Sequence, residues 1–308
     1  MNELIFQKKG LSLERLHLLC EVAHNGGIRA AVGDDPARQS LASRQLKELA
    51  DYVGVELCRR NGRSLEMTEA GRALAAIGGE FLKKMESFLL SARNLPIRFR
   101  LGVGDSVFQW YILPRMKEFQ ANFPRVQLQS FSSSNREIIR KVESNTLDAG
   151  IVRRSAVRQT GLSVSNIGEI TYRLFVPLSQ IGSSYQQKGS GLPPISTIPL
   201  CTLTGNGEYT RAMDIFLTAY NVSPALSCSS MTQMYAAVES GQYAAVLPAQ
   251  ARCSLAEDRT ACYTLPELAT FSRQIALIYR PTTTEEDDAR RTLKFLQTII
   301  SASPAPAG

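Results

Sequence analysis

The apolar positions in the first fifty residues follow a helical period. Residues 13–24, LERLHLLCEVAH, place leucine and alanine at spacings of three and four, which predicts an amphipathic helix. A very short second helix is expected over residues 28–32, IRAAV. Asp35 and Pro36 have the residue types of an N-cap and a first helical turn, so a third helix is predicted from there to the residue before Gly54.

The third helix, which contains the run RQSLASRQLKEL, has two chemically different faces. Its apolar positions recur at i, i+4, i+7 and i+11 and predict a buried face made of Ala42, Leu46, Leu49 and Val53. Its other side carries polar groups: Ser40, Ser43, Arg44 and Lys47, with Gln39 near the N-terminal end. Such groups bind phosphates and base edges in a major groove. For this helix alone, the plainer interpretation is a solvated face.

The next segment predicts a β-hairpin with a basic tip. Two short extended runs in residues 55–68, VELCRRNGRSLEMT, surround an Asn-Gly pair, which is a strong hairpin signal. Arg59, Arg60 and Arg63 lie at or near its tip. Helix, short helix, polar-faced helix and hairpin is the order of a winged helix-turn-helix, in which the third helix enters the major groove and the wing reaches the backbone or the minor groove. This order favours the DNA-binding interpretation.

A long helix then leads into a second type of pattern. The apolar periodicity of residues 69–93 suits a linker or dimerisation helix. From residue 97 onward, short apolar strands alternate with helical segments, which predicts a mainly parallel α/β sheet. A second unit of this kind begins near Thr171, so we expect two lobes with a ligand site in the cleft between them.

Composition adds little to this organisation. The chain has 308 residues, 44% of them hydrophobic, and a net charge of +7. Residues 1–94 carry fourteen Lys or Arg against twelve Asp or Glu, so charge alone does not identify a nucleic-acid binder. No apolar run approaches the length of about 20 residues that a membrane span needs, and the N-terminus lacks the pattern of a secretory signal. We therefore expect a cytoplasmic protein without a membrane partner.

The reactive residue types argue against a metal or cofactor site. Only two histidines occur, the six cysteines form no CxxC pair, and neither a P-loop nor a GxSxG motif is present. We expect no metal, no cofactor and no enzymatic activity. The cysteines are interpreted as small buried hydrophobes, but Cys201 and Cys228 are kept as a candidate redox pair. A solute-binding protein is disfavoured by the N-terminal module.

The chain resembles the family of LysR-type transcriptional regulators. The resemblance needs no gap over residues 13–71, from LERLHLLCEVAHNGG to LEMTEAG, and continues more weakly in residues 100–129 and in the segments LDAGIV and VESGQYAAVLP. It implies a winged helix-turn-helix in residues 1–68, a linker helix in 69–96, and a two-lobed periplasmic-binding-protein-like α/β domain in 97–308. Lobe I is expected at about 97–170 and 271–300, and lobe II at about 171–270. It also implies a homodimer or homotetramer that binds double-stranded DNA and a small effector.

The resemblance further implies site residues. Those for DNA are Gln39, Ser40, Ser43, Arg44 and Lys47 on the recognition helix, and Arg60 and Arg63 on the wing; Arg38 is added at the front of the helix. Asp35 stands where the family usually has leucine, and Ala37 and Arg38 also depart from its pattern, so Asp34-Asp35-Pro36 is expected to reshape the turn before this helix.

For the effector, the resemblance implies positions after several strands and at the starts of helices. These are Asp105, Ser106 and Val107, then Ser132, Ser133 and Ser134, then Arg153, and from lobe II Thr204, Gly205, Asn206, Met231 and Thr232. Hydroxyls and helix N-termini suit a carboxylate or another small anion, to which Arg153 and Arg154 can add a charge-assisted bond. The alternative is that these residues are helix caps and surface arginines.

Overall fold

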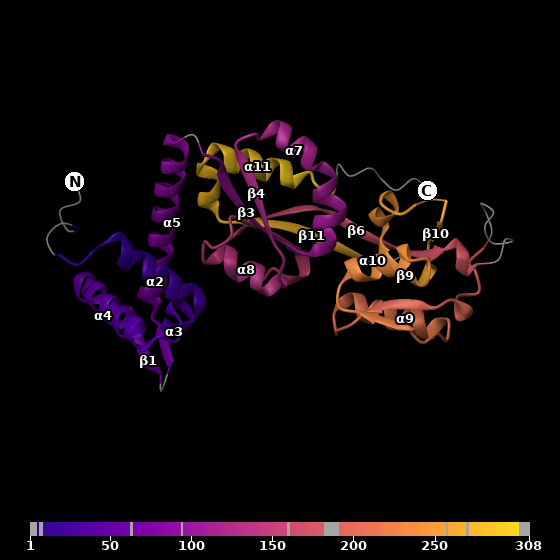
Figure 1. Ribbon diagram of the computed structural model, residues 1–308, viewed down its shortest axis with the longest axis horizontal. Coiled ribbons are helices and arrows are strands. Elements are labelled where there is room, and N and C mark those ends of the chain that lie inside the picture. Colours follow the sequence, from indigo (N-terminus) through magenta and orange to yellow (C-terminus); the bar gives the residue numbers. More distant parts are fainter. Residues whose placement is uncertain are drawn as a thin grey trace. The chain divides into compact units, whose positions relative to one another are not determined.

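The computed structural model describes residues 5, 9–61, 64–93, 95–158, 161–181, 191–256, 258–268 and 271–301. It divides into two compact units (Figure 1). The first comprises Met1–Arg100, Arg125–Gln129 and Ile139–Asp148. The second comprises Leu101–Pro124, Ser130–Ile138 and Ala149–Gly308.

The first unit begins with the three expected helices: α2 (Leu13–Asn25), α3 (Ile28–Val32) and α4 (Pro36–Val53). The N-cap of α4 is Asp35, whose carboxylate accepts from the N–H of Ala37 at 2.9 Å. Both α2 and α4 end at a glycine with positive φ, Gly26 at 81° and Gly54 at 80°, a conformation without steric cost only for glycine.

The apolar faces of α2 and α4 form the core of this region. The residues buried there are Leu18, Leu19, Val22, Ala42, Leu46, Leu49, Leu57 and Ala75. Three of the four positions predicted for α4 are therefore confirmed. Val53 was predicted to be buried but is 39% exposed, because it is the last residue of the helix and lies past the core.

The hairpin and the long helix follow. Strands β1 (Cys58–Asn61) and β2 (Ser64–Met67) pair antiparallel, with Asn61 opposite Ser64, as the Asn-Gly signal predicts. Helix α5 spans Glu69–Ala92. At its start Gly71 packs against the backbone of Leu57 so closely that an added Cβ would lie 2.0 Å from the Leu57 carbonyl oxygen. This glycine is required for the contact between α5 and the chain before the hairpin.

The remaining strands form one sheet within the described ranges, in the order β4-β3-β5-β11-β6-β9-β7-β8, with β10 also paired to β6. The strands are β3 (Ile97–Val103), β4 (Val126–Phe131), β5 (Ala149–Arg153), β6 (Ser163–Pro177), β7 (Leu200–Leu203), β8 (Leu226–Cys228), β9 (Ala244–Pro248), β10 (Thr260–Tyr263) and β11 (Ser272–Tyr279).

The sheet is mixed, and the prediction of a mainly parallel sheet is wrong. Pairs β3-β5, β7-β8 and β7-β9 are parallel, whereas β11-β5, β11-β6, β6-β9 and β10-β6 are antiparallel. The reason is the strand β6, which is fifteen residues long. Its first part pairs antiparallel with β11, and its second part pairs antiparallel with β9 and β10.

The helices beside this sheet are α6 (Asp105–Val107), α7 (Met116–Asn122), α8 (Asn135–Glu143), α9 (Glu208–Ala219), α10 (Met231–Glu239) and α11 (Asp287–Gln297). Between α6 and α7 the chain forms a π-turn, η1 (Phe108–Ile112), and a 3-10 turn, η2 (Leu113–Arg115), in place of regular α-helix, because Pro114 has no N–H to donate. Further 3-10 turns are η3 (Arg154–Ala156), η4 (Leu178–Gln180), η6 (Ile195–Thr197), η7 (Ala249–Cys253), η8 (Pro266–Leu268) and η9 (Pro281–Glu285).

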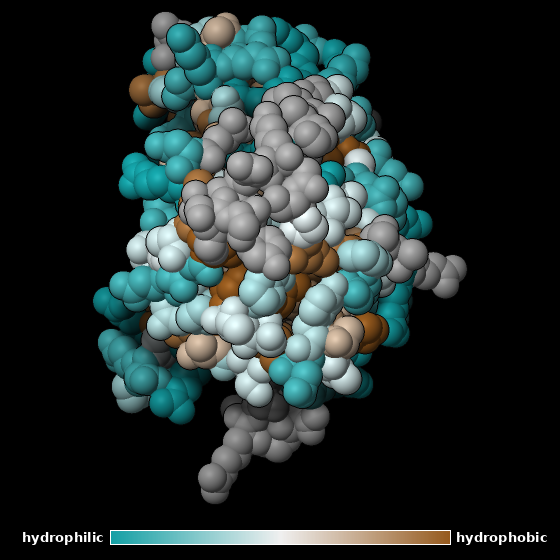
Figure 2. All heavy atoms as spheres, turned by 90° about the vertical axis from the view of Figure 1, so that its right-hand side faces the viewer, coloured by the Kyte–Doolittle hydropathy of each residue, from teal (hydrophilic) through white to brown (hydrophobic). Residues whose placement is uncertain are grey.

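The surface of the second unit near β9 and β10 is mixed in character. Seen from that side, the coloured atoms are apolar or neutral in the middle and hydrophilic around the rim (Figure 2). Within the described ranges, no helix combines the length and apolar character that crossing a membrane requires.

Candidate DNA-binding surface and ligand cavity

The polar face of α4 is exposed. Five of its candidate side chains lie in solvent: Arg38, Ser40, Ser43, Arg44 and Lys47. Two of them have an acidic neighbour on the same helix or at its cap, since Arg38 Nε lies 3.7 Å from Asp35 Oδ2 and Arg44 Nε lies 3.7 Å from Glu48 Oε1. The arginine side chains are 75% and 72% exposed, so these ion pairs are weak and both guanidiniums remain accessible to another anion.

Gln39 differs from the rest of the polar face. Its side chain is half-buried, and Nε2 donates to the carbonyl oxygen of Gly33 at 2.7 Å. This bond closes the turn between α3 and α4, beside the Asp35 cap. In this structure the amide nitrogen of Gln39 therefore supports the turn.

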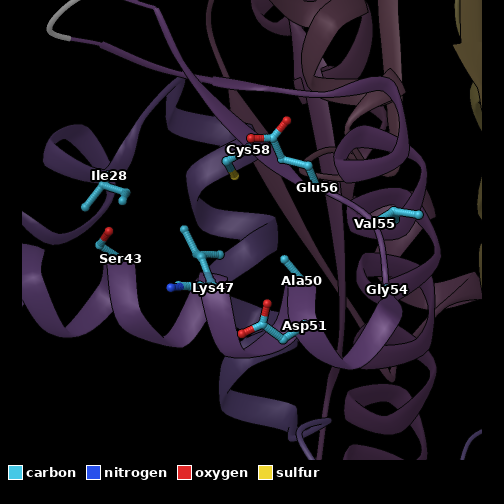
Figure 3. Close-up of a pocket in the computed structure, with 10 residues that line it drawn as sticks. Ile28, Ser43, Lys47, Ala50, Asp51, Gly54, Val55, Glu56 and Cys58 are labelled. Carbon is cyan, nitrogen blue, oxygen red and sulfur yellow. The ribbon is translucent and has the colours of Figure 1, made fainter.

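Ser43 and Lys47 also border a groove on the same unit (Figure 3). The groove has a volume of about 800 Å³ and lies between Ile28 of α3, the second half of α4 and the segment before β1. Asp51 and Glu56 line it as well. Because these carboxylates repel phosphate, the groove itself is a poor phosphate site, and the N-terminal half of α4 is the more favourable contact surface.

The predicted wing residues are only partly described. Arg63 lies outside the described residues, and of Arg60 only the backbone in β1 is described. Arg59, the neighbouring basic residue, is exposed. The hairpin itself is present, with a connection of two residues between Asn61 and Ser64.

Helix α5 exposes an apolar stripe. Its large apolar side chains recur at spacings of three and four and are 40–66% exposed: Ile77, Phe81, Met85, Phe88 and Leu89. A row of this size in solvent is typical of a helix that packs against a partner.

The same helix carries one partner of a buried ion cluster. Asp148 is 1% exposed, and its Oδ1 lies 2.8 Å from Lys83 Nζ of α5 and 3.1 Å from Arg100 Nη2 of β3. The backbone N–H of Arg100 donates to Oδ2 at 2.6 Å. Burial by itself raises the pKa of Asp148, but the charges of Lys83 and Arg100 and the hydrogen bonds from Arg100 outweigh it and hold the pKa below its ordinary value.

In the second unit, a cavity of about 410 Å³ lies at the carboxyl end of β5. Its lining comes from the end of β5, the start of α9 and the start of β11: Arg153, Ser155, Glu208, Arg211, Phe271, Ser272, Arg273 and Gln274. This volume is in the range of small-molecule sites. Three guanidiniums and one carboxylate give the lining an excess of positive charge.

The carboxylate of Glu208 is held on both oxygens. Arg153 Nη1 donates to Oε2 at 3.0 Å, and Ser155 Oγ donates to Oε1 at 3.0 Å. The position of Arg153 is fixed in turn by its backbone N–H, which donates to Asn135 Oδ1 at 3.1 Å. Burial raises the pKa of Glu208, but the bond from Ser155 and the charges of Arg153 and Arg273 lower it further than burial raises it.

Arg273 lies among aromatic rings. Its guanidinium carbon is 5.6 Å from the ring centroid of Tyr172, 5.7 Å from that of Tyr209 and 5.9 Å from that of Phe271. Its Nε is buried and has no hydrogen-bond partner among the described residues. A ring attracts the cation but does not satisfy its N–H donors, so an acceptor brought by a ligand would be favourable here.

Of the residues expected at the effector site, Arg153 alone lines this cavity. Asp105, Thr204, Asn206, Thr232, Ser132 and Ser134 are exposed, Ser106 and Ser133 are half-buried, and Val107 and Met231 are buried at 7% and 6%. The sequence interpretation missed Glu208, Arg211 and Arg273. The signal that could have found Arg273 is its place at the start of a strand that returns to the first lobe, since such a strand passes the cleft.

The two cysteines considered as a redox pair are adjacent. Cys201 in β7 and Cys228 in β8 are 2% and 8% exposed, and their sulfur atoms are 3.3 Å apart. Burial and the neighbouring Cys228 thiol raise the pKa of Cys201 to about 12. Thiolate is the reactive form, so this environment slows oxidation.

Comparison with known proteins gives two family matches. Residues 94–299 match the LysR substrate binding domain, and residues 13–72 match the bacterial regulatory helix-turn-helix protein, lysR family. Similar curated proteins include an HTH-type transcriptional repressor of Pseudomonas aeruginosa, 28% identical over 47% of this chain and 46% of that protein. A probable nitrogen assimilation transcriptional activator of Synechococcus elongatus is 23% identical over 77% of this chain and 79% of that protein. The chain thus spans about half the length of the first of these relatives.

Solved structures share the fold. A full-length OxyR variant of Pseudomonas aeruginosa has a TM-score of 0.62 at 18% identity and covers 96% of this chain and 97% of its own. ArgP of Mycobacterium tuberculosis has a TM-score of 0.63 at 15% identity, with coverage of 95% and 98%. DarR of Vibrio fischeri, solved in complex with DNA, has a TM-score of 0.53 at 15% identity, with coverage of 94% and 99%.

Proposed function

The chain belongs to the LysR family of bacterial regulators, and we propose that it is a sequence-specific transcription regulator gated by a small ligand. In this proposal α4 enters the major groove of operator DNA, and the hairpin of β1 and β2 contacts the adjacent backbone. The ligand binds in the cavity at Arg153 and Glu208. Its binding changes the spacing between the two DNA-binding domains of a dimer.

One observation carries the DNA-binding part. Helix α4 combines a buried apolar face with an exposed row of donors, within a segment that matches the lysR helix-turn-helix over residues 13–72. A donor row on a helix fixed by its apolar side is the arrangement that reads base edges and phosphates. The proposed contacts are Arg38, Gln39, Ser40, Ser43, Arg44, Lys47, Arg60 and Arg63.

The remaining proposals follow from this role. The apolar stripe on α5 supports a homodimer, and pairing of dimers gives a homotetramer. The domain bounds 1–68, 69–96 and 97–308 are kept as proposed. A regulator of chromosomal DNA works in the cytoplasm and needs no catalysis. The other effector candidates, of which Asp105 is the first in sequence and Thr232 the last, do not line the cavity. We propose that they approach the ligand when the two lobes close.

The experiment is selection of binding sites from random double-stranded DNA by the full-length chain, followed by sequencing. We expect an enriched, partly symmetric motif, since a dimer contacts two half-sites. The variant Arg44→Ala should lose the enrichment, whereas Arg136→Ala, which removes an exposed arginine of α8, should keep it. Recovery of unenriched sequences by the unaltered chain would contradict the proposal.

A second candidate is a regulator that senses oxidants through Cys201 and Cys228, favoured by their sulfur separation of 3.3 Å. Hydrogen peroxide would oxidise the two thiols to a disulfide and be reduced to two waters. The raised pKa of Cys201 disfavours it. If the chain senses oxidants in this way, peroxide should change the DNA affinity of the unaltered chain. It should not change that of the double variant Cys201→Ser/Cys228→Ser. An equal response of both proteins would exclude it.

A further inference from the structure

The lining of the cavity at Arg153 already contains one carboxylate, that of Glu208. Both of its oxygens are hydrogen-bonded, one to a guanidinium and one to a hydroxyl, as a bound carboxylic acid would be. Glu208 is the first residue of α9, whereas Arg153 ends β5. The contact therefore joins two separate elements of the second unit across the cavity.

The Arg153–Glu208 contact is suited to exchange. The two side chains are 30% and 38% exposed, so water reaches the pair and the net free energy that holds it is small. A carboxylate from solution can take the place of Glu208 on Arg153 without leaving the guanidinium unpaired, and Glu208 can turn outward into solvent.

The charges of the lining indicate the class of ligand. Arg153, Arg211 and Arg273 face one carboxylate, so the lining has an excess of two positive charges. Arg211 is exposed and makes no ion pair among the described residues. Arg273 holds a buried Nε donor without an acceptor. A ligand with one anionic group for Arg153 and a second for the exposed Arg211 matches this distribution, and the charge of Arg273 favours the same ligand.

We infer that Glu208 is an internal competitor for the effector, and that the effector is a small dicarboxylate whose one carboxylate displaces Glu208 from Arg153. The inference rests on the proposed function only in treating the bound dicarboxylate as the effector of a regulator. Without ligand, the Arg153–Glu208 pair holds the cavity in one arrangement. Binding breaks that pair and releases the start of α9, so the affinity of a ligand carboxylate for Arg153 is lowered by the free energy that the Arg153–Glu208 pair contributes.

The test is isothermal titration calorimetry of the full-length chain with four probes: succinate, butyrate, putrescine and inorganic phosphate. Succinate, butyrate and putrescine share a four-carbon length and differ in charge. We expect succinate to bind more tightly than the other three. Preference for butyrate, putrescine or phosphate, or no binding of succinate by either the unaltered chain or Glu208→Gln, would overturn the inference.

The role of Glu208 is tested by Glu208→Gln, which keeps the side-chain shape and removes the charge. Succinate affinity should rise about threefold to tenfold, the range that one partly exposed ion pair and one hydroxyl bond account for. The matched control is Asp214→Asn, an exposed charge on the same helix that is absent from the lining, which should leave the affinity within about twofold. A weaker affinity in Glu208→Gln, or an equal gain in both variants, would overturn the inference.

Arg211→Gln removes an exposed lining cation and should weaken succinate binding at least fivefold while leaving the thermal melt unchanged. Undiminished binding would contradict the recognition of a second carboxylate. These titrations contain no DNA, so their failure is separate from failure of the proposed function, which is decided by selection of binding sites.

Discussion

The ion cluster around Asp148 allows a quantitative prediction. The change Asp148→Asn keeps the size of the side chain and its ability to accept from the N–H of Arg100, but removes the charge that Lys83 and Arg100 share. Removing one partner of a fully buried ion pair costs about 3–5 kcal/mol. Here the two cations are 16% and 28% exposed and regain part of their hydration, so we expect a loss of about 2–3 kcal/mol.

The assay is thermal unfolding of the full-length chain at pH 7, followed by the fluorescence of Trp110, the one tryptophan in the sequence. Trp110 is 2% exposed and sits in the turn η1 that follows α6. For a domain of about 200 residues, the expected loss corresponds to a fall in melting temperature of about 4–12 °C. Asp214→Asn, an exposed isosteric change, serves as control and should shift it by less than 2 °C or so.

The pH dependence has a defined sign. The pKa of Asp148 is lowered in the folded chain, so its contribution to stability is present above the ordinary carboxyl pKa and is lost as pH falls through the folded value. The difference between the two proteins should therefore be constant from about pH 5 to 8 and shrink below about pH 4. Equal melting temperatures at pH 7, or a difference that grows in acid, would refute the reasoning.

Three further changes have definite outcomes. Gly71→Ala should destabilise the first unit by about 1–3 kcal/mol in urea unfolding, because the added Cβ would meet the Leu57 carbonyl oxygen. Gly79→Ala is the control, since the atom nearest to its added Cβ would be 3.5 Å away, and it should not destabilise the unit. Equal effects of the two variants would contradict the close approach of Gly71 to Leu57. Phe81→Ser together with Phe88→Ser should convert dimer to monomer in sedimentation while helix content stays the same, and an unchanged mass would place the dimer contact elsewhere. Arg38→Ala should lower affinity for all DNA sequences and reduce the slope of log affinity against log salt by about 0.9; an unchanged slope would mean that Arg38 binds no phosphate.

The N-terminal region was predictable because its elements are local. Helices α2 and α4 each begin at a side-chain cap and end at a glycine that stand next to them in sequence, as Asp35 and Gly54 do for α4. The hairpin likewise depends on two adjacent residues. The one error, Val53, arises because periodicity gives the face of a helix but not where the core beneath it ends.

The sheet was harder to predict because strand pairing is not local. The alternation of strands and helices identified the α/β class, but β6 is long and pairs with β11, which follows about one hundred residues later and in the opposite direction. Only the fold brings Glu208 at the start of α9 to Arg153 and Arg273. Of the residues that line the candidate cavity, the sequence therefore predicted Arg153 alone.

The proposed function depends first on recognition of DNA sequence by the chain. Its most direct test is fluorescence anisotropy of the full-length chain with an operator taken from the selection and with a scrambled duplex of the same composition, at one physiological salt concentration. We predict an affinity for the operator at least about 1,000-fold higher than for the scrambled duplex. Equal affinity for the two duplexes would contradict the claim, whatever the ligand measurements show.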